Sequence, residues 1–311
     1  MAEQLPSWAD GPARRAILDF IGAVTTEGGP DFVPAPERVA VFDNDGTLWC
    51  EQPAQPQVLY IMDRAAALAK ADPVLAARLP IDALIGHDLA AIHAIGKEGL
   101  FAMLSAVHAG MTVEAFTGQV GEWFATARHP KLDRPYDQVV FQPQLELLAL
   151  LRTRGFKTFI VSGGGVDFMR VFAERIYGVP PEQVIGSSGK LRFDPSDDGP
   201  CQLTKLAELD SFDDRETKAL NIGLHIGRRP LLAFGNSDGD MAMMRYTVSG
   251  PGHRLALLLH HDDAERETAY DRNFRLSPLA EALDRADALG FQVVSMKRDW
   301  KSVFAPEKAQ A

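Results

Sequence analysis

Short runs of apolar residues separated by amphipathic stretches make up most of this chain. Four runs are rich in Val, Leu, Ile and Phe and have the length of buried strands: 38–42, 157–161, 230–234 and 255–259. Apolar residues at helical spacing lie before or between them, at 13–24, 144–154, 166–177 and 217–226. Strands that alternate with helices are typical of a parallel sheet covered on both faces. We therefore predict an α/β fold with a doubly wound, mainly parallel sheet.

Residues 58–127 interrupt this alternation. The stretch is rich in Ala, Leu and Met, is broken by Gly and Pro, and has no strand pattern, so it predicts a string of helices. Segments punctuated by proline flank it as possible hinges, at 50–57 and 128–142. We expect a separate helical lobe covering the sheet edge. The predicted division is a core of residues 1–50 and 135–311 and a cap of residues 51–134.

Smaller elements are predicted toward the C-terminus. A short strand is expected at 183–186, followed by a β excursion over 191–209 with a loop at 195–200. The cluster His260–Asp263 has the residue types of a metal site, but it follows a strand and precedes a polar stretch. We interpret it as a polar loop that caps a helix at 264–271.

Composition and charge narrow the class of protein. The chain has 311 residues, of which 46% are hydrophobic and 24% charged, as in ordinary globular proteins. A net charge of −10 argues against nucleic acid and anionic membranes as partners, so an anionic substrate needs locally concentrated positive charge. Cys50 and Cys201 form no CxxC pair, which favours a reducing compartment. We find neither a secretory signal nor a membrane span, and expect a cytoplasmic protein.

Two carboxylates mark the end of the first strand. Asp43 and Asp45 follow the apolar run at 38–42 and precede a turn at Gly46-Thr47. Carboxylates two positions apart at a strand end lie close together, at the edge where open α/β sheets bind ligands. Their repulsion requires a cation, a shared proton or open solvent, and Mg²⁺ is a suitable cation. An Asp-rich turn that merely closes the strand is the alternative.

Three further features occupy later strand ends or the helix before one. Ser162–Gly165 follows the strand at 157–161, and its backbone N–H groups and hydroxyl could hold an anion. Lys218 is early in a helix and could reach the same edge to balance phosphate or carboxylate charge. Gly235–Asp240 adds acidic and amide oxygens suited to a metal. Singly, these are also explained as a glycine turn, a solvated lysine and a helix cap.

Together, in this order, the four features resemble the haloacid dehalogenase-like (HAD) superfamily of phosphohydrolases. The DxDGT motif of that family is Asp43–Thr47, its strand-end serine is Ser162, its lysine is Lys218, and its GDxxxD motif falls on Gly235–Asp240. The resemblance covers residues 38–245, and the inserted helices are similar to a C1-type cap on a Rossmann-like core. Within the superfamily, the chain most resembles the phosphoserine phosphatase and phosphorylcholine phosphatase branches.

The resemblance implies roles for individual residues. Asp43 is implied as the nucleophile and Asp45 as the general acid and base, and the metal implied is Mg²⁺. The implied phosphate-side residues are Thr47, which could instead orient the Asp45 loop, Ser162, Gly163 and Lys218. The implied metal ligands are Asp43, Asp45, Asn236 and Asp240, with Asp238 as an alternative. Two positions depart from the family pattern, because Asn236 replaces the usual metal-binding Asp and Gly239 replaces an Asn.

The function expected from this resemblance is a Mg²⁺-dependent phosphatase that hydrolyses a small phosphomonoester metabolite through an aspartyl-phosphate. A second acid at Asp45 favours phosphate ester hydrolysis over dehalogenation. A phosphotransferase or mutase of the same superfamily, or a catalytically weak phospho-ligand binding protein, are the alternatives. The sequence indicates neither the substrate nor the oligomeric state.

Some residues outside the motifs are candidates for the entrance and the cap lining. Trp49–Glu51 directly follows the first motif, where the family has a mobile flap. Candidates for choosing the leaving group are Arg64, His93, Lys97, Trp123 and Arg128. We expect Leu100, Phe101, Met103 and Leu104 to form the core of the cap.

Overall fold

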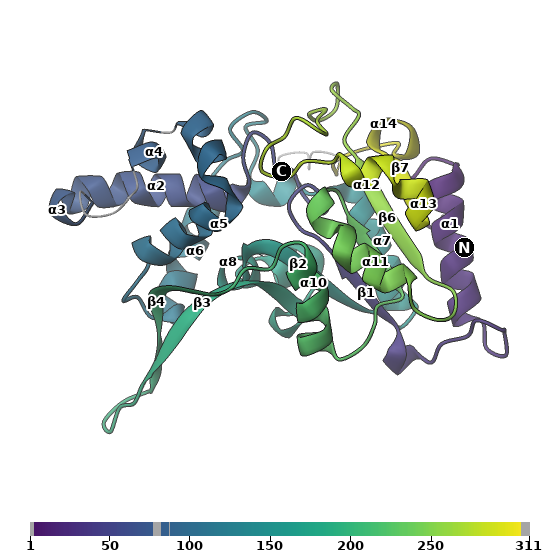
Figure 1. The fold of residues 1–311 in the computed structure, drawn as a ribbon, viewed down its shortest axis with the longest axis horizontal. Helices are drawn as coiled ribbons and strands as arrows, with labels where there is room; N and C mark the ends of the chain where they lie inside the picture. Colours follow the sequence, from purple (N-terminus) through teal and green to yellow (C-terminus); the bar gives the residue numbers. More distant parts are fainter. Residues whose placement is uncertain (1–2, 77–81, 87, 306–311) are drawn as a thin grey trace, which may run out of the picture.

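A seven-stranded sheet runs through the molecule, in the order β4-β3-β2-β1-β5-β6-β7 (Figure 1). The computed structural model describes residues 3–76, 82–86 and 88–305. All neighbouring strands are parallel except β3 and β4, which form an antiparallel hairpin at one edge. The strands are β1 (Val39–Phe42), β2 (Lys157–Gly165), β3 (Val184–Asp194), β4 (Gln202–Ser211), β5 (Leu232–Gly235), β6 (Leu255–His260) and β7 (Phe291–Ser295). The predicted doubly wound, mainly parallel α/β fold is confirmed.

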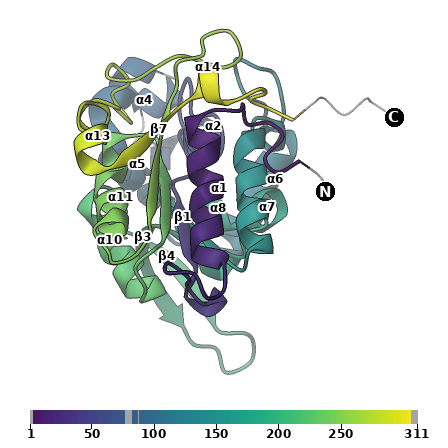
Figure 2. The same ribbon diagram turned by 90° about the vertical axis from the view of Figure 1, so that its right-hand side faces the viewer.

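Helices cover both faces of the sheet (Figure 2). On one face lie α1 (Pro12–Thr25) and α7 (Gln142–Thr153), and on the other lie α10 (Glu216–Asn221), α11 (Met241–Val248) and α13 (Ala286–Leu289). The remaining helices of the core are α8 (Val166–Arg170), α9 (Ala173–Tyr177), α12 (Glu281–Asp284) and α14 (Met296–Asp299). α10 continues directly into a π-helical turn at Ile222–Ile226, so the helix expected at 217–226 exists with a change of winding.

The central strand β1 is buried on both faces, which explains its continuous apolar sequence. Ala40 and Phe42 belong to the hydrophobic cluster beneath α1 and α7. Val39 and Val41 point the other way, into the cluster formed with α11. Side chains along a strand alternate between faces, so four consecutive apolar residues serve two cores.

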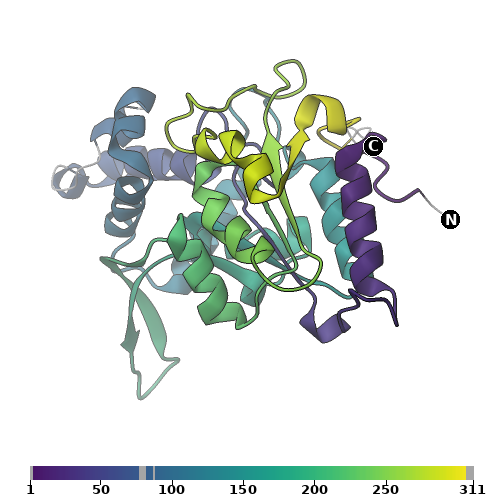
Figure 3. The ribbon, with the colours of Figure 1, turned by 45° about the vertical axis from the view of Figure 1, so that its right-hand side comes forward.

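The expected cap range, 51–134, contains helices and no strand among its described residues. They are α2 (Pro56–Ala71), α3 (Pro73–Ala76), α4 (Asp82–Ile85), α5 (Leu89–Val107) and α6 (Val113–Thr126). These helices lie at the end of the molecule opposite α1 (Figures 1 and 3). α5 is kinked at Gly96, whose φ is 75°. Residues 77–81 and 87, which fall in the predicted cap, lie outside the described residues.

The two chain passages between core and cap pair with each other. The backbone N–H of Cys50 donates to the carbonyl of Val139 at 3.1 Å. The N–H of Phe141 donates to the carbonyl of Leu48 at 2.9 Å. The chain therefore leaves the core and returns to it at one point, next to the first motif.

Three expectations about local structure were wrong or incomplete. The helix expected at 166–177 is two short helices, α8 and α9, separated at Val171–Phe172. The segments expected at 183–186 and 191–209 form one long hairpin, β3–β4, that projects from the sheet (Figure 1). The helix expected at 264–271 does not form, because the N–H of Tyr270 pairs back with the carbonyl of His261. β7 was not predicted at all.

None of the helices in the described residues is long and apolar enough to cross a membrane.

The buried sheet predicts a strong position dependence of leucine truncation. Leu257 of β6 is completely buried, whereas Leu220 of α10 is 69% exposed. Leu257→Ala should lower the free energy of unfolding by about 3 kcal/mol, because it leaves a cavity in the core. Leu220→Ala should change it by less than about 0.5 kcal/mol. Urea unfolding of the two variants measures this, and equal effects would contradict the assigned packing.

Candidate active site

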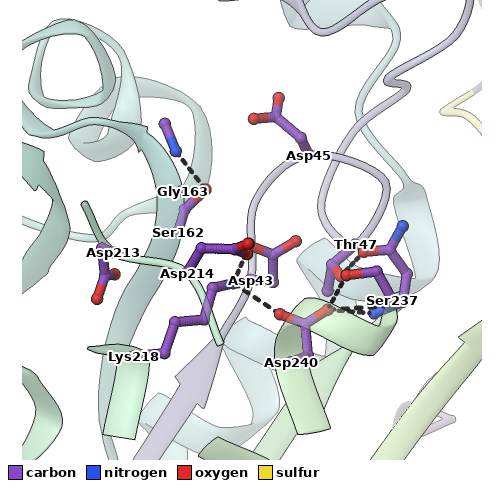
Figure 4. A network of polar contacts seen from close by, with 12 residues as sticks. Asp43, Asp45, Thr47, Ser162, Gly163, Asp213, Asp214, Lys218, Ser237 and Asp240 are labelled. Carbon is purple, nitrogen blue, oxygen red and sulfur yellow. Dashed lines mark hydrogen bonds and ion pairs between the residues drawn. The ribbon is translucent and has the colours of Figure 1, made fainter. Parts of the chain in front are cut away.

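Three neighbouring parallel strands deliver the motif residues to one edge of the sheet. β1 lies between β2 and β5, so the segments that follow the three strands are adjacent. The N–H of Asp43 continues the ladder by donating to the carbonyl of Phe234 at 2.9 Å. Figure 4 shows Asp43, Asp45, Ser162, Lys218 and Asp240 from these segments around one space.

Lys218 joins two carboxylates at the centre of this group. Its Nζ lies 2.7 Å from Asp43 Oδ1 and 2.6 Å from Asp240 Oδ1, and all three side chains are buried. The carboxylates of Asp240, Asp43 and Asp213 outweigh the effect of burial and raise the pKa of Lys218. Burial and the charge of Asp240 raise the pKa of Asp43 to about 7, in spite of Lys218. Lys218 thus stays charged beside a carboxylate that is short of positive charge.

Asp240 holds Lys218 and the start of the last motif. Its Oδ2 accepts hydrogen bonds from the backbone N–H groups of Asn236 and Ser237 and from the Ser237 hydroxyl, each at 3.0 Å. Its Oδ1 is taken by Lys218. Burial alone would raise the pKa of Asp240, but Lys218 outweighs it and lowers that pKa. With both oxygens engaged, Asp240 positions Lys218, and we remove it from the expected metal ligands.

Asp45 lies across the same space from Lys218. The turn after it uses Gly46, with φ of 76°. Asp45 Oδ1 accepts a hydrogen bond of 2.7 Å from the indole N–H of Trp49, which stacks on Phe172 with ring centroids 4.5 Å apart. Burial raises the pKa of Asp45 to about 6. The group can therefore exchange a proton near neutral pH, as a general acid and base requires.

Asn236 is fixed on both sides of its amide. The hydroxyl of Thr47 donates to its Oδ1 at 3.1 Å, and its Nδ2 donates to Glu51 Oε1 at 2.9 Å. Thr47 is completely buried and is absent from the lining of the cavity, so it orients the motif and is not placed to contact phosphate. Asp238 points elsewhere, because its carboxylate caps the backbone N–H groups of Ala280 and Ala282.

Glu51 is the residue of this site that the sequence did not place. It was expected near a mobile entrance, but it is completely buried. Its carboxylate accepts hydrogen bonds from Asn236, from the Tyr270 hydroxyl at 2.8 Å and from the Gln55 amide at 2.9 Å. Burial and the charge of Asp45 raise the pKa of Glu51 to about 7. The available signal was an acidic residue six positions beyond Asp45 in a proline-rich segment.

The polar loop at 260–263 supports the first motif from behind. His261 lies with Nε2 2.7 Å from the carbonyl of Gly46, to which it donates, and with Nδ1 3.3 Å from Glu267 Oε2. Its ring stacks on Tyr270 with centroids 4.3 Å apart. Asp263 caps the following turn by accepting from the N–H groups of Glu265 and Arg266. The loop interpretation agrees with this placement, although the predicted helix after it is absent.

Ser162 and the glycines after it form the opposite wall. β2 continues through them with a shifted register between Ser162 and Gly165, so the backbone bends at the cavity. Ser162 is 1% exposed and, with Gly163 and Gly164, lines the cavity. The carbonyl of Gly163 accepts a hydrogen bond of 2.8 Å from the Ser187 hydroxyl, which fixes the bend from β3.

Lys97 is the charged cap residue that lines the cavity, and its Nζ lies 3.6 Å from Asp214 Oδ1 of the core. Trp123 instead donates to Asp63 at 2.8 Å inside the cap, and Arg128 pairs with Asp133. Arg64 is likewise absent from the lining, and the side chain of His93 lies outside the described residues. Of the cap candidates, Lys97 is therefore the one brought to the site.

The donor types at this edge suit a hard cation. Asp43, Asp45 and Asn236 offer carboxylate, backbone carbonyl and amide oxygens without sulfur or imidazole. The raised pKa values of Asp43 and Asp45 show that Lys218 alone does not balance the buried negative charge. Within the described ranges, no three His, Cys, Asp or Glu side chains are arranged as a metal cluster. A ligand set with an amide and a main-chain carbonyl falls outside that arrangement, so both observations hold together.

Comparisons with known proteins identify the class to which this sheet and site belong. A family model described as haloacid dehalogenase-like hydrolase matches residues 40–245, more than half of the chain. The chain therefore belongs to the haloacid dehalogenase-like hydrolase family. A search of curated proteins finds no match.

Solved structures share the fold at low sequence identity. A conserved functionally unknown protein from Anaerococcus prevotii is 15% identical, with 84% of this chain and 89% of that chain covered and a TM-score of 0.55. A protein with unknown function from Bordetella pertussis is 17% identical, with 83% and 98% covered and a TM-score of 0.52. A phosphoserine phosphohydrolase-like protein from Francisella tularensis is 17% identical, with 81% and 99% covered and a TM-score of 0.43.

The turn at Gly46 offers a matched pair of glycine variants. A Cβ on Gly46 would lie 2.1 Å from Asn236 Nδ2 and 2.4 Å from Glu51 Oε1. Gly28 has the same φ of 76° but no atom within 4 Å of such a Cβ. Gly28→Ala should cost about 1 kcal/mol from backbone strain alone. Gly46→Ala should cost about 3 kcal/mol, because the clash is added to that strain. Thermal or urea unfolding compares them, and equal losses would contradict the tight contact.

Asp213 predicts a pH dependence of stability. It is completely buried, accepts a hydrogen bond of 2.9 Å from Asn221, and burial raises its pKa to about 6. Because the folded-state pKa exceeds the unfolded value, its contribution is fully present below pH 4 and is lost as pH rises through 6. Asp213→Asn should therefore reduce the fall in unfolding free energy between pH 5 and pH 8 by about 1 kcal/mol. An unchanged pH profile of urea unfolding would exclude this titration.

Proposed function

We propose that this hydrolase is a Mg²⁺-dependent phosphatase that cleaves a small phosphomonoester metabolite through an aspartyl-phosphate. The observation that carries the proposal is the buried pair of Asp43 and Lys218, which opens onto a cavity shared with Asp45 and Ser162. A carboxylate nucleophile, a cation for the phosphate and a second acid are the groups that phosphoryl transfer requires. A cytoplasmic location is part of the proposal, and neither nucleic acid nor a membrane is proposed as a partner.

In the proposed reaction, a carboxylate oxygen of Asp43 attacks phosphorus while the P–O bond to the organic group breaks. Asp45 gives its proton to the departing oxygen, so that an alcohol leaves. Water then attacks phosphorus, Asp45 takes a proton from it, and the P–O bond to Asp43 breaks. Inorganic phosphate leaves and both aspartates return to their starting states.

The phosphate oxygens are proposed to lie between Lys218 and the bend at Ser162–Gly164. Lys218 supplies a fixed positive charge, and the Ser162 hydroxyl with neighbouring N–H groups supplies donors. Residues proposed to hold Mg²⁺ are Asp43, the backbone carbonyl of Asp45 and the amide oxygen of Asn236. When bound, Mg²⁺ supplies a Lewis acid that offsets the charge of the nucleophile and the phosphate.

Replacement of the nucleophile tests the proposal. Asp43→Asn keeps the shape of the side chain but removes the attacking anion, so p-nitrophenyl phosphate hydrolysis should fall by at least about 1,000-fold. EDTA should suppress the wild-type activity, and added Mg²⁺ should restore it. Asp238→Asn is the matched control on the neighbouring loop and should retain activity, because its carboxylate caps α12.

Full activity of Asp43→Asn, or full activity in EDTA, would refute the mechanism. Tight binding of phosphate esters without turnover by the wild-type protein would instead favour the phospho-ligand binding alternative. Formation of a phosphorylated alcohol when a second alcohol is added would favour the phosphotransferase alternative.

A further inference from the structure

The cavity above Asp43 has two walls of opposite character. The core side is polar and consists of the motif residues already described. The cap side presents apolar side chains from α2 and α5, none more than 7% exposed: Val58, Ile61, Leu100, Phe101 and Leu104. These leucines and the phenylalanine were expected as cap core, and they also pack in the main hydrophobic cluster. The surface that faces the organic part of a bound ester is thus a continuation of the core.

The polar groups on the cap side are few and are nearly all engaged. The Gln55 amide donates to Glu51 at 2.9 Å and to Ser277 at 3.3 Å. Lys97 lies at ion-pair distance from Asp214. Gln57 Oε1 accepts from the N–H of Gly165 at 2.7 Å. A substrate carrying several hydroxyl groups would therefore meet few free hydrogen-bond partners opposite the phosphate site.

One donor remains free on this side. Gln57 is 8% exposed, and its Nε2 has no hydrogen-bond partner among the residues that the structure describes. The atom lies over Gly165 near the ring of Phe101, at the junction of the cavity and its extension below α5. A buried donor without a partner is costly, so a ligand acceptor at this point would be favoured.

We propose that the substrate is a phosphomonoester whose organic group is chiefly apolar and carries one hydrogen-bond acceptor for Gln57. This inference rests on the proposed function, because it concerns the leaving group of the same reaction. An apolar group is favoured against the wall of α2 and α5 by removal of its surface from water. Each unpaired hydroxyl buried there opposes binding, which excludes sugar phosphates. A zwitterionic group such as that of phosphoserine is excluded for the same reason.

The test compares esters with similar leaving oxygens and different organic groups. With Mg²⁺ present, phosphate release is measured from hexyl phosphate, glucose 6-phosphate and phosphoserine, and p-nitrophenyl phosphate reports any phosphatase activity. We expect kcat/KM for hexyl phosphate to exceed that for either polar ester at least about tenfold. If p-nitrophenyl phosphate is hydrolysed but a polar ester is cleaved as well or better, the inference is overturned and the proposed function stands. If no ester is hydrolysed, the proposed function itself fails, and the inference fails with it.

A matched pair of variants locates the preference on the cap wall. Val58 lines the cavity, whereas Val120 of α6 is completely buried and is absent from the lining. Val58→Thr places a hydroxyl on the wall and should lower the ratio of hexyl phosphate to glucose 6-phosphate kcat/KM by about threefold or more. Val120→Thr makes the same chemical change and should leave that ratio unchanged. Equal ratios in both variants would show that this wall does not choose the substrate.

Gln57→Glu tests the free donor, because it keeps the acceptor for Gly165 and replaces the amide nitrogen with oxygen. The substrates are hexyl phosphate and an ether analogue of equal length, which offers an acceptor. The wild-type protein should prefer the ether analogue, and the variant should lose this preference. An unchanged ratio of kcat/KM values would remove Gln57 from the proposal.

Discussion

The ion pairs of Lys218 are the interaction on which the rest of the site depends. A buried ammonium between Asp43 and Asp240 is tolerable because each carboxylate lies within 2.7 Å of it. Asp240 in turn orders Asn236 and Ser237, so that one side chain connects the segments after β1 and β5 with the helix between β4 and β5. Removal of any member would leave an uncompensated buried charge, which is why the sheet edge acts as a unit.

Around this centre, polar groups are held by partners from distant parts of the chain. The Asn236 amide is fixed by Thr47 and Glu51, and the Gly46 carbonyl is fixed by His261. This shell belongs to the core and leaves little freedom for the reacting carboxylates. The cap contributes mainly an apolar wall. Chemistry and choice of organic group are thus divided between two parts of the structure with different physical properties.

Much of this arrangement could be predicted from the sequence, for identifiable reasons. Asp43, Ser162 and Asn236 follow strands, and parallel strands end at the same edge, so connectivity alone brings these residues together. Lys218 required only that its helix lie beside that edge. Glu51 and His261 could not be predicted, because their contacts join positions 185 and 215 residues apart and follow no periodic pattern. The apolar pattern of α5 identified buried positions, but it could not distinguish a side chain that faces the cap interior from one that faces the cavity.

The paired passages at Cys50–Val139 and Leu48–Phe141 have a consequence for how such an enzyme can diversify. Because the inserted helices leave and rejoin the core at adjacent points, they form a closed excursion whose length does not alter the spacing of the sheet. Insertions, deletions or replacement of the whole excursion are compatible with an unchanged strand order and with the same catalytic edge. A chain built in this way can acquire new substrates by exchanging one contiguous segment, while the residues that act on phosphorus are inherited intact.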